Sequence, residues 1–205
     1  WTYEGQDQFW GTVLAARSGL QGKDMVLGML AGWAGNFAEQ AGRRWRSVED
    51  TGHDPIFAAR KAKPYPSLAR SEDYYTEGAL FWLEIDQILR EKTGGKRTID
   101  DFARLFFGMN DGDYGQLTYE VDEIITKLNQ LAPHDWAGLI ATRMNTPGQP
   151  APVQGIEKGG YRLVWKETPN PYTRAVMADA KSLSLVFSLG LTIDKDAKVT
   201  ATQWD

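Results

Sequence analysis

The sequence predicts a mainly α-helical domain, built like a helical bundle and followed by a short β-rich segment. Apolar residues recur at helical spacing over most of the first 146 residues. A stretch rich in proline and glycine then ends this pattern, and beyond it the apolar residues are spaced as in strands. We therefore expect a helical domain over residues 1–146, a linker over 147–160 and a β-rich segment over 161–205.

The first two helices are predicted over residues 4–17 and 23–40. The first helix is supported by apolar residues at helical spacing, which are Phe9, Trp10, Val13 and Leu14. Ser18-Gly19 then supplies a stop. The second helix carries the glycines Gly28, Gly32 and Gly35. Glycine lowers helix propensity, but these small residues would let another helix approach closely.

A long break over residues 41–70 separates these helices from the next one, with a short helix expected around residues 54–62. Loops of this length are usually functional or lie over a neighbouring element. The strongest helix is predicted over residues 72–92, where the apolar pattern is clear and Gly94-Gly95 supplies the end. Its first turn carries Tyr74-Tyr75.

Further helices are expected to follow. One begins at the capping-box pattern of residues 98–101, and two more cover residues 119–131 and 135–144, with Pro133 marking the break between them.

Three strands are expected in the β-rich segment, over residues 161–165, 185–193 and 198–204. Asp194-Lys195-Asp196 would form a hairpin turn between the last two.

Composition excludes several classes of function. The chain has 205 residues with 23 Lys and Arg against 27 Asp and Glu, a net charge of −4, which argues against a nucleic-acid surface. It has no cysteine, so it encodes no disulfide and no thiolate nucleophile. No apolar run reaches the roughly 20 residues of a membrane span. His53 and His134 lie far apart in the sequence, so we expect surface or capping roles for both.

Several acidic pairs could serve as the acid and the nucleophile of a glycosidase, namely Asp100-Asp101, Asp122-Glu123 and Asp111/Asp113. We expect structural roles for all of them, because they fall in the first turns of helices or in turns. Asp111-Gly112-Asp113 also resembles part of a calcium loop but lacks the glutamate at the twelfth position.

Arg43, Arg44 and Arg46, beside Trp45, leave two interpretations open. They could bind a substrate carboxylate, or they could lie on a solvated loop with their stems covering apolar surface.

The first five residues, Trp1-Thr2-Tyr3-Glu4-Gly5, place an acidic residue between aromatics and a glycine at the start of a helix. This pattern resembles the third-ligand segment of gluzincin metallopeptidases, in which a His-Glu-x-x-His helix supplies the other two zinc ligands. The whole chain is similar to the glycyl aminopeptidase family, gluzincins of bacteria that contain a PDZ domain. The similarity rests on Tyr3-Glu4-Gly5 together with the segments AARSGL (15–20), YYTEGAL (74–80), GGKRTIDD (94–101) and DW (135–136).

The resemblance implies a role for each matching residue. Glu4 would be a zinc ligand, and Tyr75 would donate a hydrogen bond to the oxyanion of the tetrahedral intermediate, with Tyr74 as the fallback. The substrates would be peptides with a free N-terminus. The segment from Ser188 to Leu191 would begin a PDZ-like domain. The alternative is a non-catalytic helical scaffold or protein-interaction domain, in which Glu4 only caps the first helix.

The chain also departs from the family pattern. It lacks the His-Glu-x-x-His segment, and with it two zinc ligands and the general base. We therefore expect a piece of a longer zinc-dependent aminopeptidase that by itself neither binds zinc tightly nor hydrolyses peptides. The face around Glu4 and Tyr75 is expected to be an exposed apolar cleft through which the chain self-associates.

Overall fold

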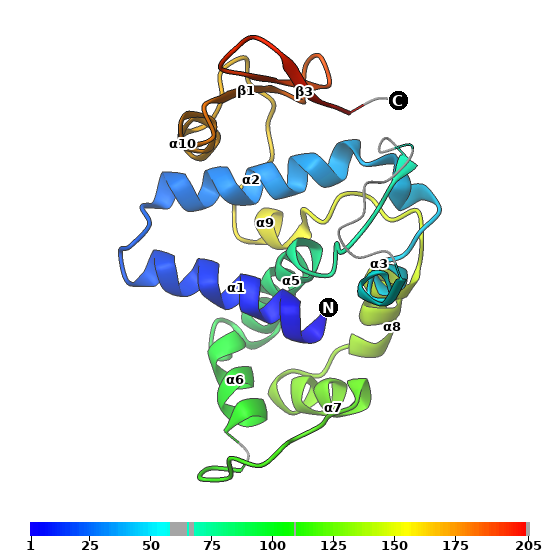
Figure 1. Cartoon of the computed structure of the whole chain (residues 1–205). Coiled ribbons are helices and arrows are strands. Elements are labelled where there is room, and N and C mark those ends of the chain that lie inside the picture. The colour runs from blue at the N-terminus through cyan, green and yellow to red at the C-terminus, as the bar shows by residue number, and fades with distance from the viewer. Residues whose placement is uncertain (58–64, 66–67, 109, 204–205) are drawn as a thin grey trace.

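The computed structural model describes residues 1–57, 65, 68–108 and 110–203. Over these residues the fold is mainly α, with a small antiparallel sheet near the C-terminal end (Figure 1). The helices are α1 (Thr2–Arg17), α2 (Lys23–Glu39), the 3-10 helix η1 (Ala41–Arg44), α3 (Val48–Thr51), α4 (Asp54–Phe57), α5 (Thr76–Thr93), α6 (Ile99–Phe107), α7 (Val121–Leu131), α8 (Trp136–Ile140), the π-helix η3 (Ala141–Asn145), α9 (Gln154–Lys158) and α10 (Pro171–Asp179). The strands are β1 (Ser182–Leu185), β2 (Leu191–Asp194) and β3 (Val199–Thr202). The predicted fold class is thereby confirmed.

Helix α5 forms the centre of the main hydrophobic core. Phe81, Trp82 and Ile85 are at most 1% exposed, as expected for a helix that is apolar on several faces and is covered on all of them. The helix ends at Gly94, which adopts a left-handed conformation (φ 60°) while its backbone N–H donates to the Arg90 carbonyl. The end predicted from Gly94-Gly95 is therefore found, for the expected conformational reason.

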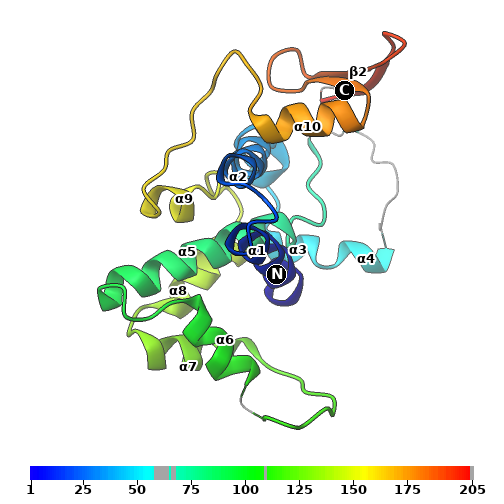
Figure 2. The ribbon, with the colours of Figure 1, turned by 90° about the vertical axis from the view of Figure 1, so that its left-hand side faces the viewer.

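The helices lie in layers around α5. Figures 1 and 2 show α1 against α5, α2 above both of these helices, and α6 with α7 at the end of the molecule away from α2. Helix α9 packs on α5 through Gly155, where a Cβ atom would lie 2.6 Å from the Glu84 backbone nitrogen. Helices α6 and α7 both start at capping boxes, Thr98/Asp101 and Glu120/Glu123, of which the first was predicted from the sequence.

The acidic pairs occupy the predicted places. Asp100-Asp101 lies in the first turn of α6 and Asp122-Glu123 in the first turn of α7. Asp113 accepts a hydrogen bond from the Gly115 backbone N–H (2.8 Å) in an exposed turn. These positions agree with structural roles.

The C-terminal segment packs on helix α2, as Figures 1 and 2 show for α10 and the sheet. A Cβ atom on Gly28 would lie 3.0 Å from the Tyr172 Cβ, and one on Gly35 would lie 3.3 Å from the Phe187 ring. The Asn170 side chain caps α10 and also donates to the Gly28 carbonyl (3.1 Å). Gly28 thus permits the close approach of helix α10, as predicted for the glycines of α2, and Gly35 admits the Phe187 ring, whereas a Cβ atom on Gly32 would meet no atom within 4 Å.

The strand prediction was wrong at residues 161–165. These residues pair with no strand, because their side chains contact α2 instead: Lys23 lies over the Tyr161 ring (5.5 Å) and Trp165 packs at Gly35. The run over 185–193 is divided between β1 and β2 by a turn that ends at Gly190 (φ 68°).

The sheet has the order β1-β2-β3, with Leu183 opposite Ile193 and Thr192 opposite Ala201. Its third strand, β3, lies within the predicted 198–204, of which residue 204 is outside the described residues.

The remaining elements modify the predicted organisation. The predicted linker contains helix α9, and the predicted β-rich segment contains helix α10. The domain division itself stays a prediction. Of the helix expected at 54–62, the structure shows α4, and residues 58–62 lie outside the described part. Among the helices described, none is long and apolar enough to cross a membrane.

Candidate functional site

Helices α1 and α5 cross at two glycines, Gly5 and Gly78. A Cβ atom on Gly5 would lie 2.8 Å from the Gly78 backbone, and one on Gly78 would lie 2.9 Å from the Gly5 Cα. Real Cβ atoms do not approach backbone atoms this closely, so only glycine fits on either side. The contact brings Glu4, which precedes Gly5, beside the first turn of α5.

Tyr75 meets Glu4 at this crossing. Tyr75 is the N-cap residue of α5 and is half-buried, as is Glu4. The charge of Glu4 is one of the causes that raise the pKa of Tyr75, so the Tyr75 hydroxyl lies close to the Glu4 carboxylate. The structure thus brings together the two residues that the resemblance had singled out for the site.

The environment keeps both tyrosines of the pair protonated. Burial raises the pKa of Tyr75, the charge of Glu4 raises that pKa further, and an interaction with Tyr74 opposes the rise. Burial, with the neighbouring Tyr75, raises the pKa of Tyr74 to about 12. The two rings lie 4.7 Å apart between centroids. At neutral pH both phenols therefore remain hydrogen-bond donors.

Tyr119, which the sequence analysis did not single out, lies next to this site. Its side chain lies near Thr2, two residues before Glu4, and its ring packs on Phe106 at 5.3 Å between centroids. Burial raises the pKa of Tyr119, and the interaction with Thr2 opposes this rise. No spacing in the sequence links Tyr119 to Thr2.

A buried group of charges lies around the same turn of α5, and the sequence analysis missed most of it. Glu77 is 3% exposed and accepts hydrogen bonds from both Arg43 and Arg70. Arg70 also pairs with Asp73, with 2.7 Å from Nε to Oδ2. Burial raises the pKa of Asp73 to about 6, and the positive charge of Arg70 opposes this rise. We call Arg43, Arg70, Asp73 and Glu77 the arginine clamp.

The clamp decides between the two interpretations of the arginines. Arg43 is 4% exposed and Arg46 holds Asp54 with both Nη atoms (3.1 and 2.6 Å), so neither is on a solvated loop. Only Arg44 and Trp45 are exposed, as that interpretation expected. Because Arg43 and Arg46 already bind carboxylates of the chain itself, they are not free to bind a substrate carboxylate.

Metal-binding groups are sparse in the described chain. Over residues 1–57, 65, 68–108 and 110–203, no three or more His, Cys, Asp or Glu side chains are grouped so that they could hold a metal ion. His53 is exposed, and His134 packs edge-on against Trp136, 4.9 Å between centroids. Glu4 takes part in none of the ion pairs formed among the described residues.

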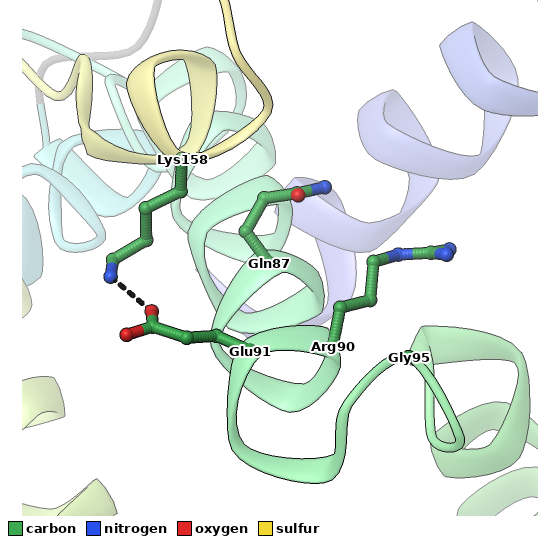
Figure 3. A pocket seen from close by; sticks show the side chains of 5 residues that line it. All are labelled: Gln87, Arg90, Glu91, Gly95 and Lys158. Carbon is green, nitrogen blue, oxygen red and sulfur yellow. Dashed lines mark hydrogen bonds and ion pairs between the residues drawn. The ribbon is translucent and has the colours of Figure 1, made fainter.

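One hollow of the described surface lies away from the predicted site residues. It measures about 550 Å³ and is lined by Gln87, Arg90, Glu91, Gly95 and Lys158, at the C-terminal end of α5. Figure 3 shows Lys158 reaching from α9 to Glu91, while Gln87 and Arg90 point to the other side. Its charged groups are paired, because Arg90 also contacts Asp86 (2.8 Å).

A second, smaller hollow is almost entirely apolar. It measures about 160 Å³ and lies between α1, α2 and α5, where its apolar lining includes Phe9, Val13, Leu30, Trp33 and Leu83. Neither Glu4 nor Tyr75 lines it. Self-association through a cleft at those two residues therefore stays a prediction.

The part of the chain that contains this site matches a known protein family. Residues 1–81 match a family of peptidases, and the family is described as M61 glycyl aminopeptidase. The match confirms the predicted relationship over this part of the chain, and it supports a peptidase function for the protein to which these residues belong. It includes both glycines of the crossing, Glu4, the tyrosine pair and the arginine clamp. No curated protein matches the chain.

Proposed function

We propose that these residues form part of a zinc-dependent aminopeptidase, with Glu4 as a zinc ligand and Tyr75 as the donor to the oxyanion. The observation that carries the proposal is the close approach of α1 and α5 at Gly5 and Gly78, which brings Tyr75 near Glu4, within the residues that match the peptidase family. The substrates would be peptides with a free N-terminus.

Glu4 fits the role of a ligand. Its carboxylate is half-buried and forms no ion pair with any described residue. A bound zinc ion would supply Lewis-acid activation of water and of the scissile carbonyl. One carboxylate does not hold zinc, so the two imidazoles and the general base would come from residues outside this sequence. Alone, these 205 residues would be inactive.

Tyr75 fits the role of an oxyanion donor. Its raised pKa keeps the phenol protonated, and its contact with Glu4 places the hydroxyl beside the ligand position. A donor that is fixed before the reaction begins stabilises the negative charge that develops on the carbonyl oxygen, and loss of one such donor typically costs 10²–10³ in turnover, about 3–4 kcal/mol.

The test for Glu4 uses the whole enzyme that contains this chain. We expect Glu4→Gln to lose most of its zinc, measured by plasma mass spectrometry, together with its activity on N-terminally unblocked peptides. The control is Asp7→Asn, an exposed carboxylate on the same helix, which should keep both. Full zinc content in Glu4→Gln would reduce Glu4 to a helix-terminal acid and favour the scaffold alternative.

The test for Tyr75 compares it with its neighbour. We expect Tyr75→Phe to keep its zinc and to lower kcat by about 10²-fold, while Tyr74→Phe changes kcat little. The reverse result would transfer the role to Tyr74. Unchanged turnover in both variants would remove the oxyanion role from the pair.

A further inference from the structure

We propose that Arg43 and Arg70 are positioning residues, which hold the turn that carries Tyr74 and Tyr75 so that the Tyr75 hydroxyl meets Glu4. This inference rests on the proposed function, because positioning has a consequence for turnover only if Tyr75 acts there. It concerns residues that touch neither the metal nor the substrate in that proposal.

The clamp binds the chain on both sides of the tyrosine pair. Asp73 lies directly before Tyr74, and Glu77 lies two residues after Tyr75. Both carboxylates are buried, at 8% and 3% exposure. Arg70 binds both of them, with Nε on Asp73 and Nη2 on Glu77. A single guanidinium therefore fixes the two ends of the segment between residues 73 and 77.

The arginines are themselves held by backbone carbonyls. Arg43 donates from Nη2 to the Pro150 carbonyl (2.9 Å). Arg70 donates from Nη1 to the Arg46 carbonyl (2.6 Å), and Arg46 donates to the Arg70 carbonyl in return (2.6 Å). These acceptors belong to separate segments of the chain. The arginines are therefore anchored to the surrounding backbone as well as to the two carboxylates.

The turn before α5 lacks a side-chain cap and contains a strained residue. Tyr75 makes no capping hydrogen bond with its side chain. Glu72 adopts a left-handed conformation (φ 53°), which is unfavourable for a residue with a side chain and persists only where the surroundings impose it. The Asp73 carbonyl accepts the first regular helical bond, from the Glu77 N–H (2.9 Å). Side-chain contacts thus define the path of this turn.

Charge alone does not account for the clamp. Its two arginines and two carboxylates are formally neutral together, and such a buried group contributes little net stability compared with apolar residues of the same size, because four charges must be desolvated. The clamp instead fixes the orientation of the turn, because the planar guanidinium of Arg70 makes hydrogen bonds at fixed angles that a lysine ammonium does not reproduce. Arg70→Lys therefore keeps the charge and removes the geometry.

The first measurement is a double-mutant cycle in the whole zinc-loaded enzyme, with Arg70→Lys, Tyr75→Phe and both together. We expect Arg70→Lys to lower kcat about 10-fold, as a small displacement of a catalytic group does, with KM and zinc content unchanged. In the Tyr75→Phe background the same substitution should have no further effect on kcat. Reductions that multiply in the double variant would show that Arg70 acts independently of Tyr75 and would overturn the inference.

The matched control is Arg143→Lys. Arg143 holds Glu84 of the same helix with two hydrogen bonds (3.0 and 3.0 Å), and Glu84 is 4% exposed, but this pair lies more than two helical turns beyond Tyr75. We expect Arg143→Lys to lower Tm about as much as Arg70→Lys and to leave kcat unchanged below Tm. An equal loss of kcat in both variants would identify a general structural effect.

The second measurement does not depend on activity. With tyrosines labelled at the ring Cζ carbon, Arg70→Lys should shift the Tyr75 resonance in the NMR spectrum, and Arg143→Lys should not. An unmoved resonance would overturn the positioning role. If instead Tyr75→Phe has normal kcat, the proposed role of Tyr75 fails, and the resonance still decides whether Arg70 positions it. Should Arg70→Lys not fold, Glu77→Gln replaces it in both measurements.

Discussion

The two ends of helix α5 hold their charged side chains in opposite ways. At the N-terminal end the side chains of Arg43, Arg70 and Glu77 are 2–4% exposed. At the C-terminal end the ion pair of Lys158 with Glu91 is 38% and 56% exposed. Exposed pairs of this kind contribute little to stability, whereas a buried charge that loses its partner is costly. Of these two sets of ion pairs, the one that is costly to disrupt lies at the end that carries Tyr75.

Removing the central carboxylate should show the largest effect. We expect Glu77→Ala to lower the free energy of unfolding by about 3–5 kcal/mol, because it leaves two buried arginines without their shared acceptor. Urea denaturation measures this change. At the other end of α5, Glu91→Ala should leave the urea midpoint nearly unchanged. Similar losses in the two variants would contradict the distinction between the ends.

Separating the two helices at the glycine crossing should have the next largest effect. We expect Gly78→Ala to cost about 1–3 kcal/mol, because its Cβ has no room against α1, and to lower activity by moving Tyr75 from Glu4. Gly11→Ala is the control, since a Cβ there meets no atom within 4 Å. It should raise stability by up to about 1 kcal/mol through helix propensity. A tolerated Gly78→Ala would mean that the close contact does not set the helix spacing.

The pH dependence of the clamp should show the smallest effect. The pKa of Asp73 is raised to about 6, above its ordinary value of 3.8, so ionised Asp73 costs stability above pH 6 and the cost is relieved as the pH falls toward 4. When the pH is lowered from 7 to 5, the free energy of unfolding of the wild type should therefore rise by about 1 kcal/mol relative to that of Asp73→Asn.

Thermal unfolding at the two pH values measures the gain. Asp100→Asn is the control, because Arg17 lowers the pKa of Asp100 and its contribution is lost only below pH 4. If wild type and Asp73→Asn respond alike between pH 7 and pH 5, the pKa of Asp73 is not raised by burial.

The sequence predicts the parts of this molecule that depend on local spacing. Residues 23–40 and 72–92 were predicted as helices, and α2 and α5 occupy nearly those ranges. Both patterns consist of neighbours three and four residues apart, which one helix brings together by itself. The same holds for the capping box at Thr98 and for the helix end at Gly94.

Contacts between distant segments were not predicted. Arg43 and Glu77 are 34 residues apart, and nothing periodic in residues 41–70 links them. The contact between Gly5 and Gly78 was likewise invisible, although each glycine belongs to a segment that carried the family resemblance. The alternating apolar residues at 161–165 predicted a strand, but their side chains contact helix α2. Spacing in the sequence does not tell whether such side chains pack against a sheet or against a helix.

Helix α10 was missed for a different reason. Its start carries a clear signal, with Asn170 as N-cap and Pro171 at the first helical position. The signal lies within a segment whose apolar spacing predicts strands, and the two local patterns conflict there. Reading the Asn-Pro pair by itself would have placed a helix start correctly.

The carbonyl of Pro150, which accepts a hydrogen bond from Arg43, sets a limit for anyone who would shorten this protein. A version ending at residue 146, where the helical pattern stops, would remove this acceptor and the Gly148 N–H that donates to the Arg43 carbonyl (2.7 Å). It would also uncover the face of α5 on which Gly155 packs. The smallest recombinant piece suited to binding or structural work on the tyrosine pair therefore extends at least through Lys158, the end of α9.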